Sequence, residues 1–152
     1  MPHDAHMTIM DCLVDAKDPL WGLASRDRDP LIACISRDIE ILLNVRRETG
    51  FISAEREHAV RSILNFGVPE FDRFGDLSSQ VEQDRLASVL EEVIATYEPR
   101  LQDVRVRVAE INMAKRSLRL LVDAVIISLG ESRAFELELS RRSGKITVGG
   151  AL

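Results

Sequence analysis

The sequence predicts an α+β fold in which N-terminal helices precede a small, mainly antiparallel sheet that ends in a hairpin. The first indication is a change in the period of the apolar residues. A helical stripe with a period of about 3.6 comprises Leu86, Val89, Leu90, Val93, Ile94 and Tyr97. From Val104 onward apolar and polar residues alternate, as they do in a strand. Pro99 lies between the two patterns. Because it lacks a backbone N–H and disfavours the α region at Glu98, we expect the helix to end there.

Three more helices are expected before this one. A short helix is predicted over residues 7–14. The next has Asp29 as its cap and Pro30 at its first position, and Gly50 is its expected terminator. Its predicted buried stripe comprises Leu31, Ile32, Ile35, Ile39, Leu42 and Leu43.

The following two helices are indicated by caps and breakers. A short helix begins at Ser53 and stops before Gly67. The long helix that leads to the proline begins near Gln80, because Ser79 and Glu82 have the spacing of a capping box.

The C-terminal half carries the strand signals. Three alternating runs, at residues 104–108, 118–127 and 135–139, predict strands. Residues 142–145 (Arg-Ser-Gly-Lys) predict a hairpin turn into a last short strand at 146–148. We also expect this part of the sheet to present an unpaired edge, to which a partner strand can be added.

Length and charge limit the possible classes of protein. The 152 residues suit one domain, which we place at 29–152 after a partly flexible segment, 1–28. The formal net charge of −5 gives no general attraction to nucleic acid or to anionic lipid, and we expect no local basic patch beyond the short Arg141-Arg142 pair. The chain begins without the pattern of a signal peptide, and Asp123 interrupts its most apolar stretch. We therefore expect a soluble, cytoplasmic protein with no direct membrane insertion.

The search for catalytic residues predicts no enzyme. Phosphate-loop and nucleophile-elbow motifs are missing from the sequence. His58 is surrounded by charged residues on a short helix, which indicates a solvated side chain. Glu98 is close to Arg100, which favours the charged carboxylate and makes it a poor general acid.

Metal and thiol chemistry are not expected either. His3 and His6 lie in a terminal segment, and such segments rarely form an ordered metal site. Cys12 and Cys34 are interpreted as small buried apolar residues. No cofactor and no metal are predicted.

Three segments together resemble a known family. Residues 37–47, 62–71 and 98–101 are similar in order and spacing to TssE, the small baseplate wedge subunit of type VI secretion systems. That family is related to a wedge protein of contractile phage tails once described as lysozyme-like. The resemblance extends from about Asp29 to Val148. It departs at Val45, where Thr is usual, and at Arg141-Arg142, where Asp-Pro usually precedes the Ser-Gly turn.

The resemblance implies a structural role in a contractile injection machine. By that implication the partners are TssF and TssG in the wedge and the first ring of the TssB/TssC sheath. The implied wedge contacts are Glu98, Pro99, Arg100 and Leu101, with Asn44 and Arg46 as secondary candidates.

Three alternatives remain open at this point. Glu98 and Arg100 can instead cap the helix and tie it to the sheet, without contacting a partner. The chain can also be a stand-alone regulatory module on the same fold, or a peptidoglycan hydrolase, which its residues do not favour.

Overall fold

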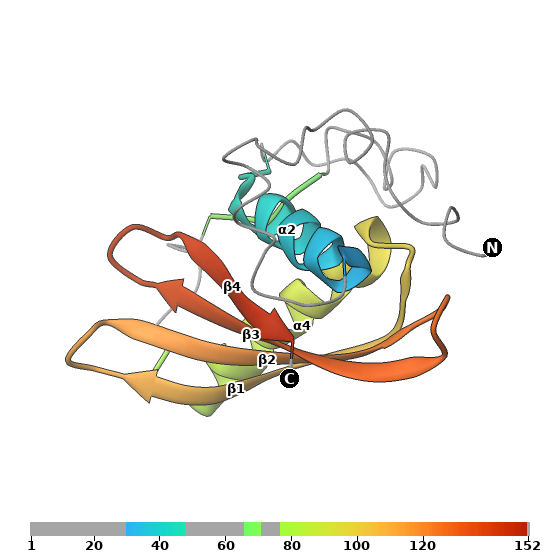
Figure 1. The fold of residues 1–152 in the computed structure, drawn as a ribbon. Coiled ribbons are helices and arrows are strands. Elements are labelled where there is room, and N and C mark those ends of the chain that lie inside the picture. Colours follow the sequence, from blue (N-terminus) through green and yellow to red (C-terminus); the bar gives the residue numbers. More distant parts are fainter. Residues whose placement is uncertain (1–29, 48–65, 71–76, 152) are drawn as a thin grey trace.

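The computed structural model describes residues 30–47, 66–70 and 77–151 (Figure 1). These form, in order, α2 (Pro30–Asn44), α4 (Gln80–Tyr97), β1 (Leu101–Asn112), β2 (Ser117–Ile126), β3 (Glu131–Ser140) and β4 (Ile146–Ala151). The strands make one antiparallel sheet in the order β1-β2-β3-β4. The predicted α+β arrangement, with helices before an antiparallel sheet, is confirmed. The helices expected at residues 7–14 and from Ser53 lie outside the described residues.

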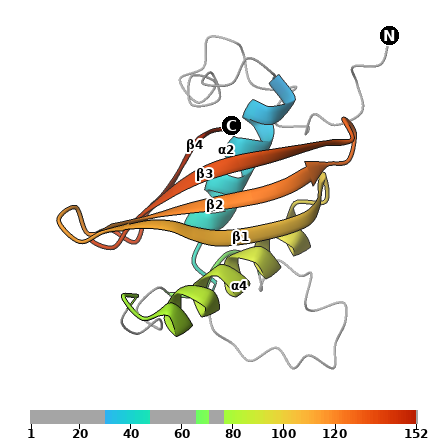
Figure 2. The same cartoon turned by 90° about the horizontal axis from the view of Figure 1, so that it is seen from below.

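Both helices cover the same face of the sheet. Helix α4 packs on β1 and α2 packs on β4, and Figure 2 shows α2 passing behind the strands while α4 runs along β1. Alternate residues of the central strands point into this layer, and each large side chain buried there contributes about 1.5–3 kcal/mol to stability. From β2 and β3 these are Leu118, Leu120, Val122, Ala124, Ile126, Phe135, Leu137 and Leu139.

The opposite face of the sheet carries charged residues, as strand alternation requires. Arg119 Nε lies 2.9 Å from Glu136 Oε1, and Arg107 Nε lies 3.3 Å from Asp123 Oδ2. All four predicted strands are present. β1, β3 and β4 are longer than predicted, whereas β2 has the predicted length of 10 residues and is shifted by one residue toward the N-terminus.

Helix α2 ends at Asn44, so the prediction that it extends to Gly50 is wrong. The reason is a contact that the local sequence does not encode. The backbone N of Arg47 donates to the carbonyl of Val68 at 2.9 Å, and the N of Val68 donates to the carbonyl of Val45 at 2.9 Å. Gly67 permits this approach with a φ of +101°, because a Cβ there would lie 2.4 Å from the Val45 oxygen.

The predicted limits of α4 are confirmed. It begins at Gln80, although the Ser79 side chain makes no capping hydrogen bond, so the expected capping box is wrong in that detail. Its last turn is closed by the Glu98 backbone N, which donates to the Ile94 carbonyl at 2.8 Å before Pro99 ends the helix. Neither α2 nor α4 is long and apolar enough to span a membrane, and they are the only helices in the described residues.

Candidate docking site at the corner between α4 and β1

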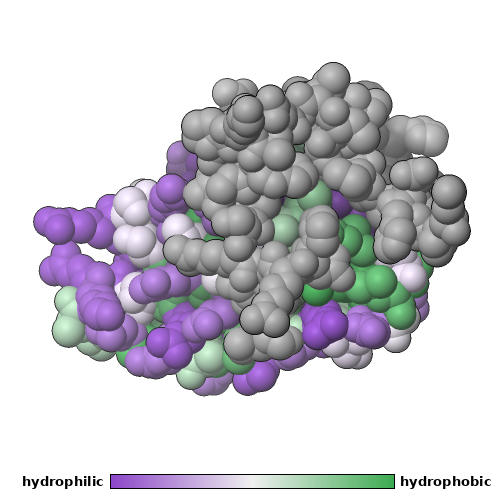
Figure 3. Space-filling view, viewed as in Figure 1, coloured by the Kyte–Doolittle hydropathy of each residue, from purple (hydrophilic) through white to green (hydrophobic). Residues whose placement is uncertain are grey.

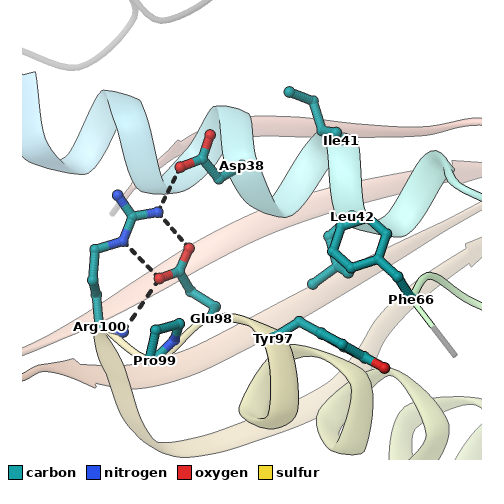
Figure 4. A pocket seen from close by; sticks show the side chains of 8 residues that line it. All are labelled: Asp38, Ile41, Leu42, Phe66, Tyr97, Glu98, Pro99 and Arg100. Atoms are coloured by element: carbon teal, nitrogen blue, oxygen red, sulfur yellow. Dashed lines mark hydrogen bonds and ion pairs between the residues drawn. The ribbon is translucent and has the colours of Figure 1, made fainter. Parts of the chain in front are cut away.

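The charged residues of the corner pair with each other. Arg100 Nε donates to Glu98 Oε1 at 2.6 Å, and Arg100 Nη2 donates to Glu98 Oε2 (Figure 4). The backbone N of Arg100 also donates to Glu98 Oε1, at 3.2 Å. Glu98 is only 3% exposed, and the Arg100 side chain is 12% exposed. The corner therefore holds a buried ion pair rather than two projecting charges.

Asp38 connects this pair to helix α2. Its Oδ2 accepts from Arg100 Nη2 at 2.6 Å, and its Oδ1 accepts from Arg37 Nη2 at 2.9 Å. Burial by itself would lower the pKa of Arg100, but the hydrogen bonds and negative charges of Glu98 and Asp38 outweigh it and raise that pKa above its ordinary value. The guanidinium is thus a permanent cation that links the corner to the middle of α2.

Asn44 makes a second connection, between the end of α2 and β4. Its Nδ2 donates to the carbonyl of Ile146 at 2.7 Å, and its Oδ1 accepts from the Ile146 backbone N at 3.0 Å. Glu40 Oε2 accepts from the Val148 backbone N at 3.0 Å. β4 is an edge strand of the sheet, as expected, but the expectation that its edge is unpaired is wrong at Ile146 and Val148. Side chains of α2 already occupy those backbone groups.

Arg46 holds the last hairpin turn against the same helix end. Its Nη1 donates to the Leu43 carbonyl at 3.1 Å, and its Nη2 donates to the Gly144 carbonyl. Burial lowers the pKa of Arg46, and the negative charge of Glu70 acts in the opposite direction. Arg46 itself lies two residues beyond α2, and its side chain connects the end of that helix to the last hairpin turn.

A pocket of about 360 Å³ opens beside the corner. It is lined by Asp38, Ile41, Leu42, Phe66, Tyr97, Glu98, Pro99 and Arg100 (Figure 4). The rings of Phe66 and Tyr97 meet edge to face, with centroids 5.1 Å apart. Ile41 is 53% exposed at the pocket, and Val45, four residues later, is 38% exposed. The pocket therefore combines an apolar wall with a paired, charged rim.

The structure brings some predicted residues together and separates others. Glu98, Pro99 and Arg100 line the pocket, whereas Leu101 lies in the core at 5% exposure, opposite Ile126 in the sheet. Asn44 and Arg46 lie at the contact of α2 with the last hairpin.

Sequence reasoning missed five residues that line the pocket: Asp38, Ile41, Leu42, Phe66 and Tyr97. Tyr97 belongs to the apolar stripe predicted for its helix. Ile41 carried a usable signal, because it is an apolar residue outside the buried stripe of α2. An apolar residue on the exposed side of an amphipathic helix is a candidate partner contact.

The described residues offer no metal centre. Within them no group of three or more His, Cys, Asp or Glu side chains is arranged to hold an ion. Cys34 is buried, as predicted, whereas His3, His6, Cys12 and His58 lie outside the described residues.

Comparison with known proteins identifies a family that the chain matches over most of its described residues. Residues 30–130 match a protein family described as baseplate wedge protein gp25. The matched range contains both described helices, β1, β2 and the corner between α4 and β1. No curated protein and no solved structure matches the chain.

Proposed function

The chain belongs to the family of baseplate wedge protein gp25, a family of phage-tail-like baseplate components, and from this we propose that it is the TssE-type wedge subunit of a type VI secretion system. The family match carries the proposal for a baseplate. The similarity of residues 37–47, 62–71 and 98–101 to TssE supports the assignment to type VI secretion. In this role the protein is cytoplasmic and structural, and it has no catalytic activity.

The corner pocket is the proposed contact with the TssF/TssG wedge. Partner contacts commonly have an apolar centre inside a polar rim, and a helix binds by placing apolar side chains into a groove. Here Ile41, Phe66, Tyr97 and Pro99 supply the apolar surface. A pocket of about 360 Å³ can accept a few large side chains of a helical bundle.

Glu98 and Arg100 serve this contact mainly by fixing its shape. Their charges are paired inside the fold and joined to Asp38, so they hold Pro99 against α2 in one position. Leu101 anchors the same corner in the core. Asn44 and Arg46 fix the C-terminal end of α2 by their hydrogen bonds. The exposed Ile41 is thereby kept in position at the pocket.

The edge of β4 is the proposed contact with the first TssB/TssC ring. An added strand would take over the backbone groups of Ile146 and Val148 that Asn44 and Glu40 now occupy. Hydrogen bonds are exchanged rather than gained in this step. Covering the edge until then protects the free subunit from pairing with other strands.

The wedge contact is tested by replacing Ile41 with Ser and measuring co-purification with TssF and TssG. We expect the Ile41→Ser protein to keep its fold, because about half of this side chain is already exposed, and to lose most wedge binding. Urea unfolding of the same variant checks that the loss is not due to instability.

The matched control is Val81→Ser, at a 72% exposed aliphatic residue in the first turn of α4. Val81 and Tyr97 are separated by roughly 24 Å along the helix at a rise of about 1.5 Å per residue. The control should bind the wedge normally. If the Ile41→Ser protein binds TssF and TssG normally, the pocket is not part of the interface. If the unaltered protein does not bind them, the assignment to the wedge is wrong.

A further inference from the structure

The end of the sheet far from the corner is formed by two hairpin turns. One turn joins β1 to β2 and the other joins β3 to β4, and both lie at the same end in Figure 1 and in Figure 2. The backbone N of Arg141 donates to the carbonyl of Arg116 at 2.8 Å, which holds the two turns side by side. Five exposed cationic residues, here called the cationic end, are gathered by this contact: Lys115, Arg116, Arg141, Arg142 and Lys145.

These cations differ from the other cations of the sheet. Elsewhere on the strands each arginine side chain has a carboxylate within 4.0 Å; the pairs are Arg105–Glu91, Arg107–Asp123, Arg119–Glu136 and Arg133–Glu131. Among the described residues, none of the five members of the cationic end has such a partner.

Two carboxylates of the described residues, Glu110 and Glu138, line a hollow at the base of this end. Glu110 is engaged with Arg119 at 3.3 Å, and Glu138 lies with Lys115 around a small hollow. In a protein of net charge −5, the cationic end is therefore a local and largely uncompensated positive surface. Figure 3 shows mainly hydrophilic residues at this end, on the left of the view.

A hollow of about 470 Å³ lies among these cations. It is lined by Ile111, Asn112, Met113, Arg116, Ser117 and Arg141. The amide of Asn112 and the hydroxyl of Ser117 can bond to peptide groups, and Met113, which is 66% exposed, offers an adaptable apolar contact. Arg116 and Arg141 can each bind a carboxylate with two donors.

We propose that the cationic end binds an acidic segment of a partner polypeptide. The mixture of arginines, an amide, a hydroxyl and a thioether suits Asp and Glu side chains interspersed with apolar residues. The described residues of this end contain no aromatic ring on which the bases of a single strand could stack. A bilayer would also meet the net negative charge of the rest of the molecule, whereas a short acidic segment contacts the cationic end alone.

The site is separate from the wedge pocket. β1 begins at the corner and ends at the cationic end, so its 12 residues, at about 3.3 Å each, set the two sites roughly 40 Å apart. If the experiment on one site contradicts its proposal, the proposal for the other site can still be tested independently.

Binding is measured by fluorescence anisotropy on the full-length protein. The probe is a labelled 12-residue peptide of Glu and Asp with two Leu residues. The test variant is Arg116→Gln/Arg141→Gln/Arg142→Gln, and we expect it to bind the probe at least about tenfold more weakly than the unaltered protein. The affinity of the unaltered protein should fall as salt is raised, because the contacts are exposed charges.

The matched control is Arg105→Gln/Arg107→Gln/Arg133→Gln, which removes the same number of positive charges from residues that are already paired. It should keep its affinity within about threefold, since those cations are engaged by carboxylates. If both variants lose peptide affinity equally, net charge alone drives binding, and the proposal of a specific site at the cationic end is wrong.

Two further probes identify the class of ligand. They are a 12-nucleotide single-stranded DNA and vesicles containing phosphatidylglycerol, both measured with the unaltered protein. Binding of the peptide in preference to both supports the proposal. Equal or tighter binding of either one overturns the assignment to a polypeptide, as does a peptide that does not bind.

Discussion

The two ends of β1 use arginine in opposite ways. At the corner, the Arg100 side chain is 12% exposed and lies between the carboxylates of Glu98 and Asp38. At the cationic end, Arg141 and Arg142 are exposed and have no carboxylate partner among the described residues. The residue type is the same at both ends, so it is the burial and the nearby carboxylates that decide whether an arginine stabilises the fold or remains available to a partner.

The physical difference lies in the cost of removing charge from water. A buried ion pair is stable only while both members are present, because either one alone is an uncompensated charge in a poorly solvated site. An exposed cation is solvated in either case, and its removal changes stability little. The following predictions test this contrast.

The largest loss of stability is expected for Arg100→Ala. This change leaves Glu98 buried and without its partner, and breaking a buried pair costs about 3–5 kcal/mol. The measurement is the free energy of unfolding from urea denaturation. Arg105→Ala is the control, because Arg105 is 78% exposed although it pairs with Glu91 at 2.7 Å, and it should cost only about 0–1 kcal/mol. Equal losses in the two variants would remove the distinction between buried and exposed arginines.

An intermediate loss of stability is expected for Asn44→Ala. The change leaves the backbone N–H and carbonyl of the buried Ile146 without their side-chain partner, at a cost of about 1–3 kcal/mol. Hydrogen exchange at the Ile146 amide should accelerate in the variant. Asn112→Ala is the control at the cationic end, where the amide oxygen caps the exposed Lys115 backbone N, and it should cost less than about 1 kcal/mol. Unchanged exchange at Ile146 would show that α2 does not protect the β4 edge.

The smallest change in stability is expected for Arg142→Ala. Its side chain is exposed in the last hairpin turn, so the free energy of unfolding should change by no more than about 0.5 kcal/mol. Thermal unfolding followed by circular dichroism is sufficient to measure this. A loss comparable to that of Arg100→Ala would mean that the cationic end holds the fold together and is not a free surface.

Much of the fold was predictable because its signals are local. The change from helical to strand period, together with Pro99, identified the end of α4 and the beginning of the sheet. The spacing of Ser79 and Glu82 located its start, even though the Ser79 cap bond is not made. The end of α2 was mispredicted because the pairing of residues 45–47 with Val68 competes with the helix, and Gly50 is only a local signal.

The sequence by itself determined the order of the elements and the rigid turn at Pro99. Only the tertiary structure decided that Arg100 turns inward to Asp38, 62 positions earlier in the chain, and that Asn44 covers the edge of β4. It also brought the cations of two separate turns to one end of the sheet. The reason is that periodicity, proline and turn residues act on neighbours in the chain. The partner of a charge or of a backbone group depends on how distant segments pack.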